Sequence, residues 1–307
     1  MIIRLDSSCP FNLDFTLCCG QVFRWDKRGT WWYGIVGEDV FKIRQTDNEL
    51  EFENNDVDFV RHYFGLSEDL PKIFSTIRKD KHIKHAIEKF AGLRILHQNP
   101  WECLISYICA TYKNIPAVKQ MLLKLSRKFG RKITFDKRYF YAFPASQSLA
   151  KASVKELAEC GLGYRAKYVS GTAKRIYDDD FSFEDLRKAS HEKARRELVN
   201  LPGVGLKVAD CVSLFSLEKL EAFPIDIWIK RVVLKYYANN FPTESVKKMS
   251  SKKSPSKAEY ERLSLFGRKY FGEYAGYAQE YLYHSERAET SNPKMQKTFK
   301  LNPKNSI

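Results

Sequence analysis

The hydrophobic pattern of this chain changes near residue 56, and this change constrains the fold more than any other feature. Residues 21–54 hold four short runs rich in Val, Ile, Phe, Tyr and Trp (QVFRW, WWYGIVG, VFKIRQ and LEFEN), separated by the turn signals DKRGT, GED and TDN. Such runs predict an antiparallel meander. From about residue 56 onwards, apolar residues recur at helical spacing, for example at Trp101, Leu104, Ile105, Ile108 and Cys109.

Strands followed by helices, without alternation, indicate an α+β fold rather than a doubly wound sheet. We expect an N-terminal antiparallel β domain with flanking helices over residues 1–98, a mostly helical core over 99–289 and a polar tail over 290–307. The segment 242–257 carries five lysines and lacks apolar periodicity, so it is predicted to be a mobile surface loop.

The charge of the chain favours a polyanionic partner. Its 307 residues include 52 Lys and Arg against 37 Asp and Glu, a net charge of +15, and clustered cations release counterions when they neutralise phosphates. Hydrophobic residues make up 44% of the chain, enough to bury real cores, which excludes a disordered nucleic-acid tail. On charge alone, nucleic-acid binding and a generic basic surface are about equally open.

The seven cysteines predict reduced thiols. Their number is odd, and several lie in apolar stretches such as ECLISYICA, where cysteine packs as a small hydrophobic residue. No CxxC occurs and no cysteine follows Cys211, which excludes a four-cysteine zinc or iron–sulfur site late in the chain. No run of about 18 apolar residues and no leader pattern occurs, so we expect no membrane span and a protein that stays where it is made.

The segment 195–217 contains two helical patterns separated by LPGVG, residues 201–205. Gly203 and Gly205 make this a tight turn with an exposed backbone. Its amides lie beside the N-terminus of the second helix, where free N–H groups and the helix dipole attract a phosphate. An ordinary helical hairpin is the alternative, and it is the more frequent one for such a motif taken alone.

Lys207 falls in the first turn of the second helix, on an edge shared with apolar residues and Cys211. The helix dipole and partial burial both favour the neutral amine, which is a nucleophile. A lysine whose ammonium head lies in water, or one that pairs with phosphate, is equally compatible with the residues alone. Further on, Asp226 follows FPI and is a natural helix N-cap. If it also faces Lys207, the amine can attack a carbon while the carboxylate supports positive charge or moves protons.

The hairpin LPGVGLKVADC followed by FPID resembles the helix-hairpin-helix DNA glycosylases that carry a Gly/Pro-rich loop and a distal catalytic aspartate. The resemblance extends to the 8-oxoguanine DNA glycosylase group through four further blocks in the right order. These are CGQVFRW (19–25), NPWECLISYICA (99–110), GLGYRAKYVS (161–170) and FGEYAGYAQEYLY (271–283). The predicted N-terminal meander agrees with the N-terminal β domain of that group.

This resemblance implies a bifunctional DNA glycosylase and AP lyase of base excision repair. Lys207 would attack the sugar C1′ of a flipped 8-oxoguanine nucleotide, expel the base and form a Schiff base that permits β-elimination, with Asp226 assisting. Extrusion is physically required because a duplex hides C1′. The implied partner is duplex DNA containing 8-oxoguanine. We expect a monomer that needs no cofactor, in the cytoplasm at the nucleoid or in a eukaryotic nucleus.

The resemblance also implies a base pocket. Cys211 would lie against one face of the base and Tyr283 against the other, Gln279 would read its Watson–Crick edge, and the Gly20 carbonyl would accept the extra N7 hydrogen of 8-oxoguanine. Cys211 is four residues from Lys207, and Tyr283 is four residues from Gln279, so each pair shares a helix face. An ordinary core face is the alternative for these residues.

Further residues match positions that contact DNA or a cation in the family. Tyr164 would wedge into the duplex and Arg165 would bind the orphaned cytosine, while Asn114, Gly203 and Gly205 would contact DNA. A structural cation at the hairpin is implied through three backbone carbonyls, those of Val199, Leu201 and Val204.

At several positions the chain differs from the family pattern, in residues that would contact the base opposite the lesion or a DNA phosphate. Tyr112 and Lys113 stand where the eukaryotic members carry asparagines, and Ala117 stands where they carry a cytosine-reading arginine. Losing these donors predicts a weaker preference for cytosine opposite the lesion. Trp228 replaces a phosphate-binding histidine, although Lys230 or Arg231 could supply charge there.

Two other functions stay open at this point. A glycosylase of the same fold could act on another lesion, although Lys207 argues against a purely monofunctional alkyl-base enzyme. A non-catalytic DNA-binding module would use the hairpin for backbone grip and would need neither Lys207 nor Asp226.

Overall fold

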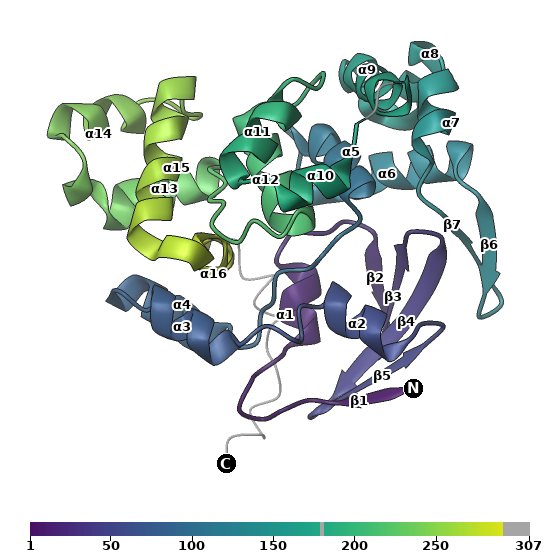
Figure 1. The fold of residues 1–307 in the computed structure, drawn as a ribbon, viewed down its shortest axis with the longest axis horizontal. Helices are drawn as coiled ribbons and strands as arrows, with labels where there is room; N and C mark the ends of the chain where they lie inside the picture. The colour runs from purple at the N-terminus through teal and green to yellow at the C-terminus, as the bar shows by residue number, and fades with distance from the viewer. Residues whose placement is uncertain (179–180, 291–307) are drawn as a thin grey trace.

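The structure, a computed structural model, describes residues 1–178 and 181–290. From residue 291 onwards, the predicted polar tail lies outside these residues. Figure 1 shows the N-terminal sheet on one side of the molecule, with the helices of the remaining chain stacked over and beside it. The expected α+β architecture, an antiparallel sheet domain followed by a helical core, is confirmed.

The N-terminal sheet is antiparallel and has the strand order β1-β5-β4-β3-β2. Its strands are β1 Ile2–Arg4, β2 Trp25–Arg28, β3 Trp31–Val36, β4 Asp39–Thr46 and β5 Glu49–Glu53. The predicted meander is therefore confirmed for β2 to β5. The prediction of a strand over QVFRW is wrong except at its last residue, because residues 21–24 have irregular backbone and β2 begins at Trp25. Strand β1 was not expected.

The two faces of this sheet are covered by different elements. One face buries residues such as Trp25, Phe41 and Phe52 against helices α1 (Leu13–Cys18) and α2 (Val57–Tyr63). The other face buries Tyr33 and Val40 against Phe140, which lies on a small β-hairpin later in the chain.

That hairpin corrects the expectation of helices throughout the chain after residue 56. It consists of β6 (Lys132–Phe135) and β7 (Arg138–Tyr141). Its two turn residues, Asp136 and Lys137, both have positive φ, at 51° and 57°. This conformation joins two strands with the correct twist, but it is usually signalled by Asn-Gly or Asp-Gly, which this turn lacks.

Helices α3 (Leu70–Ile77) and α4 (Lys81–Lys89) precede the linker 91–99, and the other helices of the core follow it. Up to the glycine-rich loop these are α5 Pro100–Ala110, α6 Ile115–Phe129, α7 Ser146–Lys151, α8 Val154–Leu157, η1 Ala158–Leu162, α9 Arg165–Asp178 and α10 Phe183–Lys188. The remaining elements are α11 His191–Val199, α12 Leu206–Ser216, α13 Ile227–Tyr236, η2 Ala238–Asn240, α14 Thr243–Ser250, α15 Lys257–Phe271, η3 Gly272–Tyr274 and α16 Ala275–Thr290. None of the helices described here is long and apolar enough to cross a bilayer. All seven cysteines are free thiols, as predicted.

Helix α14 corrects the prediction of a loop over residues 242–257. Residues Thr243–Ser250 are helical, and Met249 is only 1% exposed. Val246 and Met249 are three residues apart, so they lie on the same face of the helix. Because lysines surround these two apolar residues, the sequence pattern did not indicate a helix here.

Gln21 joins the β domain to the linker. Its Nε2 donates to the carbonyl oxygens of Thr16 (3.0 Å) and Arg94 (2.8 Å), and its Oε1 accepts from the amide of Leu96 (2.8 Å). The Gln21 carbonyl accepts from Gln98 Nε2 at 2.8 Å. Because Gln21 is fully buried, these bonds fix the position of the preceding residue, Gly20.

Asp210 lies in the middle of α12 and is fully buried. Its carboxylate accepts from the Tyr260 hydroxyl at 2.6 Å and lies 3.0 Å from Arg195 Nε and 3.1 Å from His191 Nε2. These partners come from α15 and α11, so one carboxylate holds three helices together.

Replacing Asp210 with Ala should lower the free energy of unfolding by about 3 to 5 kcal/mol, because Arg195 and Tyr260 lose a buried partner. Urea unfolding followed by circular dichroism would measure this loss. The control Glu261→Gln removes the other carboxylate of Arg195, whose side chain is 44% exposed, and should cost less than about 1 kcal/mol. Equal losses in both variants would contradict the structural role of Asp210.

Candidate active site

The predicted hairpin is present and its loop is packed against α9. Gly203 has a φ of 78°, and a Cβ atom there would lie 2.5 Å from the Cβ of Tyr168. The Thr172 hydroxyl donates to the carbonyl of Pro202 at 2.7 Å. Gly205, by contrast, is exposed and precedes α12 as its N-cap residue. The loop therefore needs glycine for close packing at one position and presents open backbone at the other.

Lys207 is half-buried in the first turn of α12. Its Nζ lies 4.6 Å from the centre of the Tyr107 ring, which comes from α5. Tyr107 is itself fixed, since its hydroxyl donates to the Gln21 carbonyl at 3.1 Å and its ring stacks on Phe215. The aromatic face attracts a cation and holds the amine at this place. Sequence reasoning missed Tyr107 because it lies within an otherwise apolar helix.

Asp226 caps α13, as predicted, and also interacts with Lys207. Its Oδ1 accepts from the amides of Trp228 (2.9 Å) and Ile229 (2.8 Å). Burial raises the pKa of this carboxyl, while the two amide bonds and the positive charge of Lys207 oppose the rise. The cap thus places a carboxyl group beside the lysine.

Cys211 lies one turn after Lys207 and is 3% exposed. Burial raises the pKa of its thiol to about 12, although the nearby Lys207 amine lowers it. The thiol therefore stays neutral at physiological pH and offers a polarisable surface beside the amine.

Gly20 and Tyr283 meet although 263 residues separate them in the chain. A Cβ atom on Gly20, whose φ is 111°, would lie 3.4 Å from the Tyr283 hydroxyl and 2.9 Å from Arg287 Nη1. Burial raises the pKa of Tyr283, and the negative charge of Asp226 acts in the same direction. The structure therefore brings Tyr283 near both Gly20 and Asp226.

Gln279 lies one turn before Tyr283 in α16 and is 5% exposed. Its side-chain Oε1 is buried and has no hydrogen-bond partner among the described residues. A buried acceptor of this kind is usually satisfied, so this amide is available to a bound molecule.

Two charged residues of α16 belong to this region and were missed. Arg287 donates through Nη1 to the Cys19 carbonyl at 2.6 Å, and its guanidinium lies 5.7 Å from the centre of the Tyr283 ring. Glu280 is 3% exposed. Burial raises the pKa of Glu280 to about 7, against the opposing effects of Cys19, Arg287 and Lys207. An acidic residue inside the apolar run AQEYLY was the available signal for Glu280.

The structure brings together the residues that match family positions at the DNA strand opposite the lesion. Tyr164 is 54% exposed, whereas Arg165 is only 3% exposed, so Arg165 is a buried residue and not a solvated one. Arg165 Nε donates to the Thr111 carbonyl at 3.1 Å, and the guanidinium lies 4.4 Å from the centre of the Tyr164 ring. Asn114 is exposed and caps α6 by accepting from the Ala117 amide. The contact of Arg165 with Thr111 joins these two segments.

Lys230, one of two residues expected to replace a phosphate-binding histidine, is not placed for that role. It is 4% exposed and its amine donates to the Lys252 carbonyl. Arg231 is nearer to the surface, with its guanidinium 4.8 Å from the centre of the Trp228 ring. Its side chain is 49% exposed, and it pairs weakly with Glu286 at 4.0 Å.

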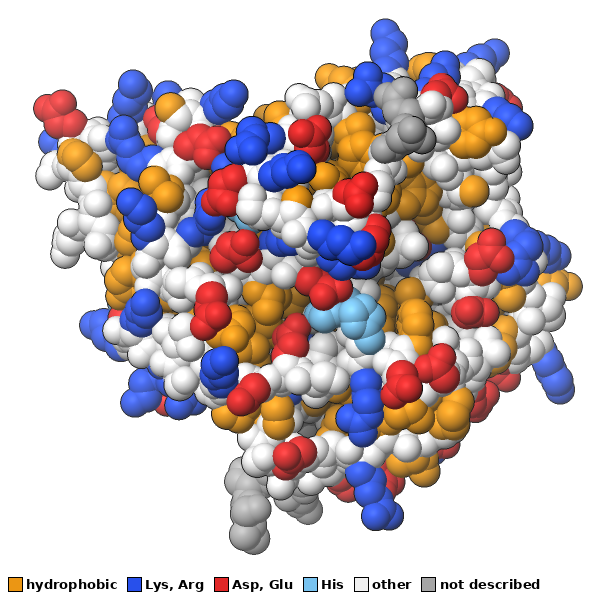
Figure 2. Space-filling model, viewed as in Figure 1, with side chains coloured by type: hydrophobic (Ala, Val, Ile, Leu, Met, Phe, Trp, Pro, Cys, Tyr) orange, Lys and Arg blue, Asp and Glu red, His pale blue; other side chains and the backbone are white. Residues whose placement is uncertain are grey.

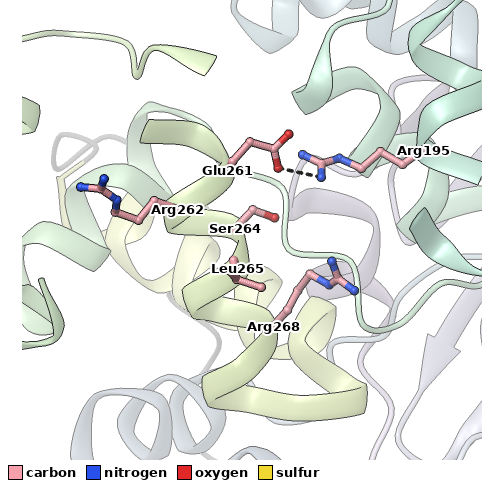
Figure 3. Close-up of a pocket in the computed structure, with 6 residues that line it drawn as sticks. All are labelled: Arg195, Glu261, Arg262, Ser264, Leu265 and Arg268. Carbon is pink, nitrogen blue, oxygen red and sulfur yellow. Dashed lines mark hydrogen bonds and ion pairs between the residues drawn. The ribbon is translucent and has the colours of Figure 1, made fainter. Parts of the chain in front are cut away.

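A surface hollow between α11 and α15 does not include Lys207. Figure 3 shows its lining residues Arg195, Glu261, Arg262, Ser264, Leu265 and Arg268. Arg195 already pairs with Asp210 and Glu261, and Arg268 pairs with Glu192. We therefore assign this hollow to the packing of the two helices.

Comparisons with known proteins identify the family of the chain. Residues 3–104 match the family model described as 8-oxoguanine DNA glycosylase, N-terminal domain. Residues 105–256 match that of the HhH-GPD superfamily base excision DNA repair protein. N-glycosylase/DNA lyase OGG1 of Arabidopsis thaliana is 32% identical over 293 residues, which cover 90% of this chain and 77% of the relative. The N-glycosylase/DNA lyase of Saccharomyces cerevisiae is 33% identical, covering 78% of this chain and 68% of the relative.

A similar fold occurs in a solved bacterial structure. The 8-oxoguanine glycosylase/lyase of Clostridium acetobutylicum, in its apo form, has a TM-score of 0.82 at 32% identity, covering 92% of this chain and 95% of that one. The family resemblance seen in the sequence is thus confirmed by the two family models, the curated relatives and the fold. The chain belongs to the 8-oxoguanine DNA glycosylase family of helix-hairpin-helix N-glycosylase/DNA lyases.

Proposed function

We propose that this chain removes 8-oxoguanine from duplex DNA and then cleaves the strand, with Lys207 as the nucleophile. The observation that carries this proposal is the position of the Lys207 amine, which lies over the Tyr107 ring and interacts with both Cys211 and Asp226. A lysine that only binds a DNA phosphate would need none of these neighbours. A solved complex of the Clostridium acetobutylicum enzyme, 29% identical, contains double-stranded DNA with cytosine opposite 8-oxoG, and this supports the substrate class.

The proposed chemistry begins with the extruded nucleotide. Lys207 gives an ammonium proton to the departing base, and its Nζ bonds to C1′ as the bond from C1′ to the base breaks, so the base leaves with the electron pair and that proton. The anionic Asp226 stabilises the positive charge that develops on the sugar. Opening of the sugar gives a Schiff base on Lys207, and loss of a C2′ proton then expels the 3′ phosphate by β-elimination. Because the amine supplies the nucleophile, we propose that the reaction needs no cofactor.

The base pocket that we propose is formed by Cys211, Gln279, Tyr283 and Gly20. Cys211 offers a neutral thiol, and Gln279 offers an amide oxygen without a partner among the described residues. Gly20 allows the Tyr283 hydroxyl and Arg287 to approach its Cα closely. Because glycine has no side chain, a base can also approach the Gly20 carbonyl closely, and this carbonyl would accept the N7 hydrogen that distinguishes 8-oxoguanine from guanine.

We propose that the hairpin grips the DNA backbone, with Gly203 and Gly205 providing close approach, and that Asn114, Tyr164 and Arg165 lie toward the opposite strand. The proposed cation site uses the carbonyls of Val199, Leu201 and Val204. The Leu201 carbonyl already accepts from the Val204 amide at 3.1 Å, and its second lone pair is compatible with an ion. A protein with this substrate would act at the nucleoid or in a nucleus.

Borohydride should trap the wild-type protein on a duplex that contains 8-oxoguanine, and Lys207→Gln should reduce the trapped product at least 100-fold, because the Schiff base needs this amine. Denaturing electrophoresis measures the product. Lys84→Gln, a change at an exposed lysine of α4, should trap normally.

Intact DNA binding without a wild-type adduct would overturn the lyase proposal. Base release would then separate a monofunctional glycosylase from a binding module. An adduct that persists in Lys207→Gln would assign the nucleophile elsewhere.

Trapping should vary less than about tenfold among duplexes with each of the four bases opposite the lesion, because the methyl group of Ala117 cannot donate to cytosine acceptors. Ala117→Arg should increase the preference for cytosine. Single-turnover excision rates would measure both effects. A wild-type preference for cytosine above 100-fold would contradict this prediction.

Glu280 should make stability depend on pH. Its pKa rises from 4.5 to about 7 on folding, so its protonated form stabilises the protein below pH 4.5 and this contribution is lost as the pH rises through about 7. Cys19, Arg287, Asp226 and Lys207 act on this group and are unchanged in Glu280→Gln. Relative to wild type, this variant should gain about 2 to 3 kcal/mol between pH 5 and pH 8 in urea unfolding. Identical pH dependence in the two proteins would refute the prediction.

A further inference from the structure

Two histidines and a glutamate from three separate segments meet at the junction of the β domain and the helical core. His62 lies in α2, His97 in the linker before α5, and Glu218 in the turn after α12. One potential ligand atom from each lies within 4.8 Å of the other two. Figure 2 shows histidine side chains gathered between α2 and α10, with acidic side chains beside them.

The spacing of these atoms suits one metal ion. His97 Nδ1 lies 3.4 Å from His62 Nδ1 and 3.9 Å from Glu218 Oε1. His62 Nε2 lies 3.9 Å from the same oxygen. Ligands at about 2.0 to 2.1 Å from a tetrahedral zinc ion lie about 3.3 Å apart. Only one nitrogen of His62 can bind the ion, and with one ligand atom from each residue within 4.8 Å of the other two, side-chain rotations would bring all three onto it.

The second nitrogen of His97 has the partner that a metal-bound histidine usually has. His97 Nε2 lies 2.9 Å from Glu68 Oε1, and Glu68 in turn accepts from the Tyr277 hydroxyl. A histidine that donates from Nε2 to a carboxylate carries its free lone pair on Nδ1. That lone pair is on the nitrogen near His62 and Glu218.

Glu218 occupies a position that ordinarily favours glycine. It follows the end of α12 with a φ of 59°, and the next amide, that of Lys219, donates back to the Ser213 carbonyl at 3.0 Å. A glutamate in this left-handed cap costs backbone energy that glycine avoids. Arg187 Nε lies 3.3 Å from Glu218 Oε1, but a carboxylate has about four lone-pair sites and can keep this partner while binding an ion.

We propose that His62, His97 and Glu218 form a binding site for a divalent zinc-class ion, with water completing the coordination. Two imidazoles and one carboxylate are a donor set typical of zinc. The bound ion would join α2 of the β domain to the turn that ends the lysine-bearing helix. This inference does not depend on the proposed function.

The test uses the full chain without a histidine tag, stripped with a chelator and titrated with Zn²⁺ alone by calorimetry. We expect one equivalent bound with a Kd below about 10 µM, a higher Tm with zinc, and Co²⁺ absorption bands of a low-coordinate site. His62→Gln and Glu218→Gln should each weaken binding at least tenfold and abolish the Tm rise. His62 has a side chain that is 57% exposed, so its replacement should leave the fold intact.

His85→Gln serves as the matched control, because His85 is also exposed but lies outside the cluster. All variants keep the seven cysteines, so binding by thiols would be common to them. Wild-type binding weaker than 100 µM would overturn the proposal. Equal affinity and equal Tm rise in wild type and His62→Gln would also overturn it.

Discussion

Helix α12 is buried from Val208 to Ser216, and the rest of the helical core is built around it. Helices α5 and α11 pack directly against it. A helix enclosed in this way contacts water mainly through its first turn, and this is where the hairpin loop ends and Lys207 stands. The buried charge of Asp210 is tolerated because Arg195, His191 and Tyr260 surround it. The lysine is thus held at the boundary between core and surface by a helix that has little freedom to move.

The groups around Lys207 are kept in different electrostatic environments. Two backbone amides bind the Asp226 carboxylate and oppose the effect of its burial, whereas Glu280 Oε1 has no partner among the described residues. Burial raises the pKa of Glu280 to about 7, although a hydrogen bond with Cys19 opposes the rise. Two carboxyl groups near one amine but in different surroundings are a common way to separate an anion from a proton carrier. Arg287 adds a positive charge beside Tyr283 and Gly20, at the place proposed for the base.

Both ends of α12 contact the β domain or the linker that follows it. Near its first turn, Lys207 contacts Tyr107, whose hydroxyl binds the backbone of Gln21. At its last turn, the Phe215 carbonyl accepts from the Gln98 amide of the linker, and Glu218 approaches His62 and His97. Packing of the N-terminal domain therefore reaches both ends of the helix that carries the proposed nucleophile. A rigid support of this kind is what a precisely positioned amine requires.

Local patterns identified most of the fold and the main candidate residues. The meander, the helix that contains Trp101 and Cys109, the helical hairpin around residues 201–205 and the Asp226 cap were all predicted, because each depends on residues close together in the chain. The hairpin β6–β7 and helix α14 were missed, since one has an unusual turn sequence and the other is anchored by Met249 among lysines.

The sequence by itself determined the order of strands and helices and the chemical types available: a lysine after a glycine-rich loop, a capping aspartate and a glutamine one turn before a tyrosine. Only the tertiary structure decided that Tyr107 lies beneath Lys207, that Glu280 is buried near Asp226, and that Arg165 bonds to Thr111 instead of water. The physical reason is that periodicity reports which face of an element is buried, whereas partners and pKa values depend on elements distant in the chain that pack against that face.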